Sequence, residues 1–154
     1  MPKPADMVRC FLTVAWLLSA VLSARAQNAD AILGQWLTGT GKAHIEIYRQ
    51  HGLYQGRIVW LRAPFNEEGR PKLDVHNPSV ALQSRPLIGM VNLTGFRYDK
   101  AEGVYTHGMI YDPESGKTYR CMMSVRPDGT LSVRGYIGFT WIGRTEVWQR
   151  VRGK

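Results

Sequence analysis

The sequence predicts an all-β domain, an eight-stranded antiparallel up-and-down barrel, and three observations lead to this prediction. From Gly34 onwards, runs of β-branched and aromatic residues are separated by short stretches of Gly, Asp, Asn or Pro. No amphipathic stretch of helical period lasts beyond about two turns. The chain has 154 residues with 16 Gly and 8 Pro, and a length of about 150 residues is typical of one turn-rich domain.

A short apolar segment near the start of the chain predicts export. Residues 10–22 form an apolar run, and Lys3 and Arg9 precede it. The run is shorter than the roughly 20 apolar residues that a membrane-spanning helix needs, so it is typical of a cleaved signal. We therefore expect residues 1–26 to be a signal peptide.

The cleavage site is predicted between Ala26 and Gln27, because Ala24-Arg25-Ala26 has the small-x-small pattern of signal peptidase sites. Residues 27–154 would then be a single β-barrel domain in the periplasm, with no stable membrane anchor. This part of the chain has 17 basic and 11 acidic residues, a net charge of +6. Its charge favours anionic envelope components as partners, and export removes nucleic acid from the expected partners.

The strands are predicted from alternation of apolar and polar residues. In the second strand Ala43, Ile45 and Ile47 share one face. Most connections between strands are too short for a parallel crossover, so we expect an antiparallel meander that closes into a barrel and leaves no exposed edge. The eight expected strands are residues 35–38, 42–49, 53–62, 86–98, 104–111, 117–126, 130–137 and 145–151.

Turn sequences mark the tight connections between these strands. Residues 39–41 and the pair His51-Gly52 connect the first three strands. Residues 112–116 and 127–129 each combine Asp, Pro and Gly, where Pro sets the backbone for a turn and Gly accepts a positive φ. These four segments are therefore expected to be short loops.

One connection, residues 63–85, is too long for a hairpin. Connections of this length are usually lids or carry an added element. Asn77 precedes Pro78, and this pair is typical of the start of a helix, with Asn77 as the N-cap. We expect a short helix or a lid in this loop.

Several ordered stretches of the chain closely resemble the bacterial domain of unknown function 2147 family. The likeness extends over roughly residues 30–152. It implies exported proteins with a compact β domain and no assigned reaction. The matching stretches are residues 41–45, 74–78, 85–89, 95–96, 110–119, 131–136 and 143–145.

A second resemblance is to the calycin superfamily, the lipocalin and fatty-acid-binding barrels. It rests on Gly34-Gln35-Trp36 at the start of the first strand. The resemblance implies that Trp36 closes one end of the barrel and that a basic residue of the last strand packs over its ring. Arg150 fits this role by its place in the chain, and Arg144 is the rival candidate.

Five residues are candidates for holding a ligand at the barrel mouth. Two aromatic side chains, Trp60 and Tyr111, would contact an apolar body, while Arg85, Arg97 or Asp74 would fix a polar end. A structural interpretation stands beside this one. The aromatic residues would fill the core, Asp74 would pair with Arg85 to hold the long loop, and Asn77 would cap its helix.

No motif in the chain predicts catalysis, a metal site or a cofactor. The four histidines lack the spacing of paired metal ligands, and no nucleophile elbow or phosphate loop is present. Cys121 has Tyr119 and Met123 on its side of a strand, so we expect a buried, unreactive thiol. The protein is therefore expected not to be an enzyme.

The sequence favours a periplasmic binding module whose barrel holds either a small, partly apolar ligand, for which an acid is one option, or an envelope component. The alternative is an envelope interaction protein with a packed barrel and a basic outer surface. An open cavity would favour the first hypothesis, and a filled interior with an exposed apolar patch would favour the second.

Overall fold

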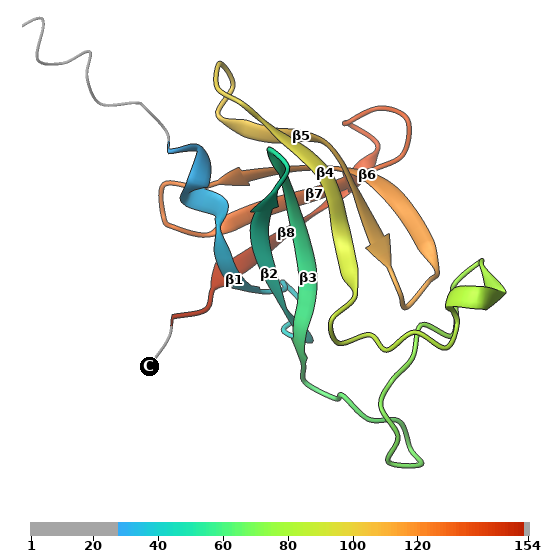
Figure 1. Ribbon diagram of the computed structural model, residues 1–154. Coiled ribbons are helices and arrows are strands. Elements are labelled where there is room, and N and C mark those ends of the chain that lie inside the picture. Colours follow the sequence, from blue (N-terminus) through green and yellow to red (C-terminus); the bar gives the residue numbers. More distant parts are fainter. Residues whose placement is uncertain (1–27, 153–154) are drawn as a thin grey trace, which may run out of the picture.

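The computed structural model describes residues 28–152, which form a closed barrel of eight antiparallel strands (Figure 1). Each strand pairs with its neighbours in sequence, and β8 pairs with β1 to close the barrel. The predicted fold class is confirmed. The predicted signal peptide, residues 1–26, lies outside the described residues.

The strands lie close to the predicted positions, with one exception. The fourth strand was expected from Pro86 but begins at Val91, because Pro86 pairs with Leu73 in an isolated bridge and Gly89 turns the chain with a φ of 90°. In order, the elements are η1 (Ala29–Ile32), β1 (Gly34–Leu37), β2 (Ala43–Gln50), β3 (Leu53–Leu61), η2 (Val80–Leu82), β4 (Val91–Asp99), β5 (Val104–Asp112), β6 (Lys117–Val125), β7 (Leu131–Tyr136) and β8 (Gly143–Arg150).

The core lies inside the barrel and comes from the alternate residues of each strand. Ala43, Ile45 and Ile47 of β2 are buried, as the alternation predicts. Cys121 and Met123 of β6 are also buried in this core. Burial raises the pKa of the Cys121 thiol to about 12.

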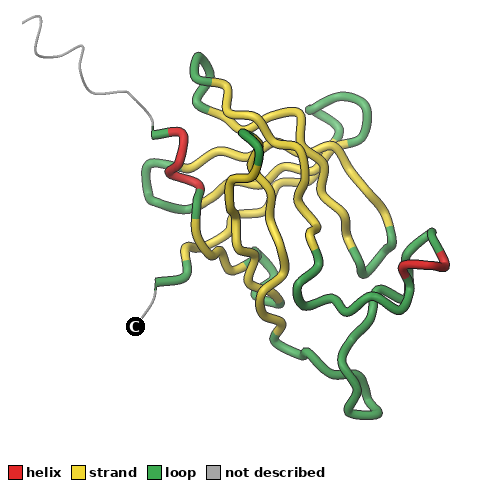
Figure 2. Tube along the Cα trace, in the orientation of Figure 1, coloured by secondary structure: helices red, strands yellow, loops and turns green. Residues whose placement is uncertain are grey.

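The short helix η1 closes one end of the barrel, at the side where the chain enters (Figures 1 and 2). Four side chains of the barrel hold it. The Trp36 indole donates to the Ile32 carbonyl over 2.8 Å, and the Tyr105 hydroxyl donates to the Ala29 carbonyl over 2.6 Å. Tyr54 donates to the Asp30 carboxylate, and Arg150 donates to the carbonyls of Ala31 and Leu33.

Arg150 also covers the tryptophan that forms the floor. The guanidinium carbon of Arg150 lies 4.1 Å from the centroid of the fully buried Trp36 ring, and the two residues are paired between β8 and β1. Arg144, the rival candidate, begins the same strand and lines the opposite, open end of the barrel. Trp36 and Arg150 thus attach η1 to β1 and β8, the two strands that close the barrel.

Two of the register shifts in the barrel change which side chains face inward near its open end. In β3 the register moves from Ile58 opposite Ile45 to Trp60 opposite His44, so Val59 is an extra residue. In β4 the register moves from Leu93 opposite Gly56 to Val91 opposite Arg57, so Asn92 is an extra residue. A bulge reverses the alternation beyond it, and both bulges lie near the open end of the barrel.

The long connection between β3 and β4 extends beyond the open end and carries η2 (Figure 2). The helix begins later than predicted. Ser79 is its N-cap residue, with no side-chain hydrogen bond to the helix. Asn77 does not cap it, because its Oδ1 accepts from the backbone N–H of Ser79, before the helix, and its Nδ2 donates to Asp74.

Candidate functional site

The open end of the barrel holds a cavity of about 900 Å³. It is bounded by the β1–β2 turn, the end of β3, the β5–β6 hairpin and the β7–β8 loop. Eight-stranded barrels of the lipocalin type are wide enough for one small ligand, and binding pockets of small molecules have about 300–1,000 Å³. The open end of the barrel therefore has room for a small molecule next to the packed core.

The wall of this cavity is mostly apolar and its rim is charged. The apolar part includes Ile45, Ile58, Leu61, Leu87, Ile110, Val133 and Trp148. The charged part includes Lys42, Arg62, Lys72, Arg144, Asp112, Glu114 and Glu146. This arrangement suits a molecule with an apolar body and a polar end.

The acidic side chains of the rim have partners. Glu114 accepts from Lys42, Glu146 accepts from the Trp148 indole, and Asp112 accepts from Ser115. Within residues 28–152, the side chains of Arg62, Lys72 and Arg144 make no ion pair or hydrogen bond. The rim acids are thus engaged as acceptors, whereas these three cations are free to meet a ligand.

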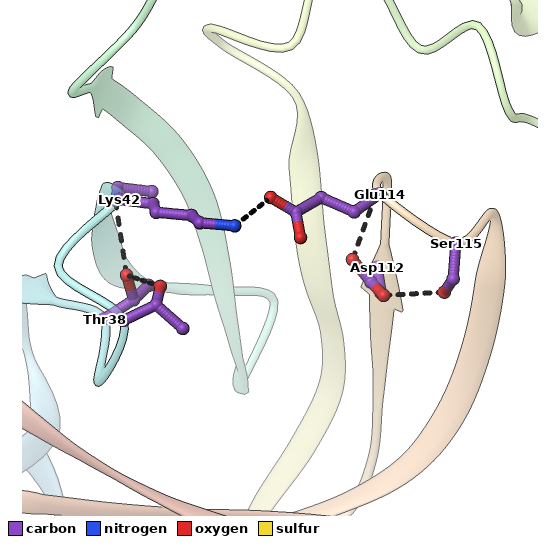
Figure 3. A network of polar contacts seen from close by, with 7 residues as sticks. Thr38, Lys42, Asp112, Glu114 and Ser115 are labelled. Carbon is purple, nitrogen blue, oxygen red and sulfur yellow. Dashed lines mark hydrogen bonds and ion pairs between the residues drawn. The ribbon is translucent and has the colours of Figure 1, made fainter.

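Lys42 and Glu114 connect two sides of the mouth (Figure 3). Lys42 Nζ lies 2.7 Å from Glu114 Oε1. Lys42 directly precedes β2, and Glu114 lies in the hairpin between β5 and β6. In a closed barrel of eight strands, β6 is four strands from β2 in either direction, so this ion pair crosses the open end.

A second polar cluster, the Asp74 node, fastens the long loop to the barrel. It consists of Asp74, Asn77, Arg85 and Tyr111. The Asp74 side chain is fully buried and accepts from Tyr111 Oη over 2.6 Å, and from Arg85 Nη2 and Asn77 Nδ2 over 2.7 Å each. The node joins the loop to β5 at the rim of the cavity.

The hydrogen bonds of the node keep its carboxylate charged. Burial alone would raise the pKa of Asp74, but the hydrogen bonds from Tyr111, Arg85 and Asn77 outweigh burial and hold this pKa below its usual value. Burial, together with the hydrogen bond to Asp74, raises the pKa of Tyr111 to about 12. Asp74 therefore remains an anion and Tyr111 remains a neutral donor.

Of the five residues that the sequence predicts as ligand contacts, one lines the cavity and four do not. Tyr111 lines the cavity, but its hydroxyl is bound to Asp74. Asp74 and Arg85 hold the loop and do not line the cavity. The structural interpretation of this pair is therefore the one that the geometry supports.

Trp60 and Arg97 lie outside the barrel, which corrects the expectation that they line its mouth. The bulge at Val59 turns Trp60 outward, where it is 40% exposed and its ring centroid lies 4.4 Å from that of His44. Arg97 is an exposed residue of β4 that follows the inward-facing Phe96. Neither side chain lines the cavity.

Other residues of the site escaped the sequence analysis. Asn92 is buried in the cavity wall, and Arg62, Lys72 and Arg144 contribute the unpaired charge. A basic residue at the end of a strand, as in Leu61-Arg62 and Gly143-Arg144, was an available signal for the rim. No comparable signal existed for Asn92, because its burial depends on the bulge.

No group of three or more His, Cys, Asp or Glu side chains among residues 28–152 could hold a metal ion. No helix in this range is long and apolar enough to cross a bilayer.

The chain matches one known protein family over the whole barrel. A family model described as "Uncharacterized protein conserved in bacteria (DUF2147)" matches residues 34–150, from the first residue of β1 to the last residue of β8. The chain belongs to the DUF2147 family. The match covers the whole DUF2147 barrel together with the rim residues and the Asp74 node, and the resemblance noted in the sequence is confirmed.

Among solved structures, the DUF2147 chain is similar to a protein titled "Protein HP1028 from the human pathogen Helicobacter pylori belongs to the lipocalin family". The TM-score is 0.66 at 21% sequence identity, and the match covers 79% of this chain and 83% of that chain. At this identity the likeness establishes the lipocalin-like fold. No curated protein matches the DUF2147 chain.

Proposed function

We propose that this protein binds a small, partly apolar acid inside its barrel. The observation that carries the proposal is the cavity of about 900 Å³, in which apolar walls lie beneath a rim with unpaired cations. An apolar body gains free energy by leaving water for such a wall. A carboxylate or phosphate at the mouth would meet Arg62, Lys72 and Arg144, and charge-assisted hydrogen bonds to these groups contribute about 1.5–3 kcal/mol each.

The test is a titration with decanoic acid, followed by tryptophan emission. Trp148 lines the cavity, so a bound acyl chain should change its emission. Arg144→Ala and Lys72→Ala should each weaken binding by roughly tenfold. Arg97→Ala is the matched control, because Arg97 is a basic residue on the outer face, and it should leave the affinity unchanged.

The absence of any emission change across a panel of acidic amphiphiles would contradict the proposal. Equal losses in Arg144→Ala and Arg97→Ala would also contradict it, because they would show a general charge effect rather than a site at the mouth.

We also propose that the protein acts in the periplasm after removal of residues 1–26. Support comes from the apolar run and the Ala24-Arg25-Ala26 pattern in the sequence. Mass analysis of the protein from a periplasmic extract should give a chain that begins at Gln27, and Ala26→Asp should block processing. A periplasmic form that still begins at Met1 would contradict this proposal.

A second candidate function is attachment to an anionic envelope surface through the β7–β8 loop. Phe139 and Trp141 stack on each other in this loop and are 64% and 74% exposed. Arg134 donates to the Thr140 carbonyl at its base, and Arg144 follows it. Vesicles with anionic lipids should shift the emission of Trp141 to shorter wavelength, whereas Trp141→Ala should abolish vesicle binding.

A further inference from the structure

Asn92 is a polar side chain in the cavity wall that the fold itself does not use. It is 8% exposed and lines the cavity. Its Oδ1 is buried and has no hydrogen-bond partner among residues 28–152. Buried polar groups nearly always have partners, because they lose their hydrogen bonds to water on burial. An orphaned amide in a binding cavity therefore indicates a group that a ligand would satisfy.

An irregularity in the pairing of β4 with β3 places Asn92 in the cavity wall. Asn92 is the extra residue between Val91 and Leu93 in the pairing with β3. The two consecutive side chains of Asn92 and Leu93 are both buried, which regular alternation does not allow. The bulge is thus the feature that turns an amide toward the interior.

Three side chains that line the cavity with Asn92 do not satisfy its amide oxygen. Leu93 is paired with Ile110 of β5, so the antiparallel register places Tyr111 opposite Asn92. The single hydroxyl proton of Tyr111 is donated to Asp74 over 2.6 Å. Ile58 and Leu87, which also line the cavity, offer only hydrocarbon.

We propose that Asn92 recognises a hydrogen-bond donor within the apolar body of the ligand, so that the ligand is a hydroxylated or amide-containing acyl acid rather than a plain fatty acid. This inference rests on the proposed binding function. A ligand hydroxyl or amide N–H would donate to Asn92 Oδ1, and a hydroxyl could also accept from Nδ2. A plain hydrocarbon chain would cover the amide and leave it unsatisfied, and sites built around a hydrogen bond discriminate against analogues that lack its partner.

The experiment compares decanoic acid with its monohydroxy isomers, using the hydroxyl at successive carbons and tryptophan emission as the readout. The wild-type protein should bind at least one isomer about tenfold more tightly than decanoic acid. Asn92→Leu should remove this preference and bind decanoic acid at least as tightly as the wild type does. Without ligand, Asn92→Leu should melt at a higher temperature, because it removes an unsatisfied buried group.

Two further variants complete the test. Thr94→Val is the matched control, because Thr94 is an exposed polar residue of the same strand, and it should keep the preference. Asn92→Val introduces a smaller apolar side chain than Asn92→Leu, and it tests the loss of the amide if leucine does not fit. Equal affinity of the wild type for decanoic acid and all its isomers would overturn the inference while leaving the proposed function standing. Retention of the preference in both Asn92 variants would also overturn it, and absence of all binding would overturn both proposals.

Discussion

Lys42 and Glu114 form an ion pair across the mouth of the barrel, although 72 residues separate them in the chain. The pair joins the start of β2 to the hairpin between β5 and β6, and both residues line the cavity. Both side chains are exposed to solvent, and exposed ion pairs add little to stability. We therefore expect the ion pair to affect access to the cavity more than the stability of the fold.

Removal of this ion pair should make exchange of a ligand faster. In Lys42→Ala the β5–β6 hairpin loses its connection to the β1–β2 turn, so association and dissociation of decanoic acid should both accelerate several-fold, as measured by stopped-flow emission. High salt should accelerate dissociation from the wild type, because it screens both this exposed ion pair and the attraction between the acid and the rim cations. Arg57→Ala breaks the ion pair of Arg57 with Glu46 on the outer wall and is the control. Unchanged rates in Lys42→Ala would show that the pair does not control access.

The floor of the barrel should depend strongly on Trp36. Replacing a fully buried tryptophan by alanine costs about 3–5 kcal/mol, so Trp36→Ala should unfold or strongly destabilise the domain in thermal unfolding followed by circular dichroism. Arg150→Ala should cost less, because it removes the contact with the ring and the hydrogen bonds to η1 but leaves no large cavity. An unchanged melting temperature of Trp36→Ala would refute this account of the closed end.

The Asp74 node should make the attachment of the long loop dependent on pH. The folded-state pKa of Asp74 lies below its usual value of 3.8, so its contribution to stability is complete above that value and is lost as the pH falls through the lower, folded-state pKa. Hydrogen exchange of the backbone amides of residues 73–77 should therefore accelerate, relative to the rest of the barrel, as the pH falls below about 4. In Asp74→Asn this acid-dependent step should disappear. A step of equal size in the variant would assign it to another group.

The thiol of Cys121 should be unreactive in the folded protein. It is fully buried, and burial raises its pKa to about 12, so very little thiolate exists near neutral pH. In a protein without residues 1–26, Ellman's reagent should label this cysteine only after denaturant is added. Arg120→Cys is the positive control, because Arg120 is the exposed neighbour on the same strand. Rapid labelling of the native wild type would indicate that the barrel opens locally.

The parts of the molecule that follow strand periodicity were predictable from the sequence. Ala43, Ile45 and Ile47 face inward as expected, and the short turns lead to an antiparallel closed barrel. The likeness to known barrels led to Trp36 and Arg150, whose side chains lie against each other. These features depend on local pattern and on order in the chain.

The ligand contacts were less predictable because one-residue bulges change the face of a strand. Val59 turns Trp60 outward, and the extra residue Asn92 turns inward. Both residues lie within a continuous strand sequence, so the sequence does not show where the inward and outward faces exchange. Asn92 is informative only once the partners of Tyr111 are known, and those partners come from a distant loop.

The closed end of the barrel is built from η1, β1 and β8, which lie far apart in the chain, and this has a consequence for the order of folding. Arg150 donates to the Ala31 carbonyl across 119 residues of sequence, so the floor cannot be completed until the last strand has been synthesised. Contacts at such long sequence separation slow the folding of β proteins. A chain emerging from the ribosome therefore cannot complete this end of the barrel until Arg150 has left the exit tunnel.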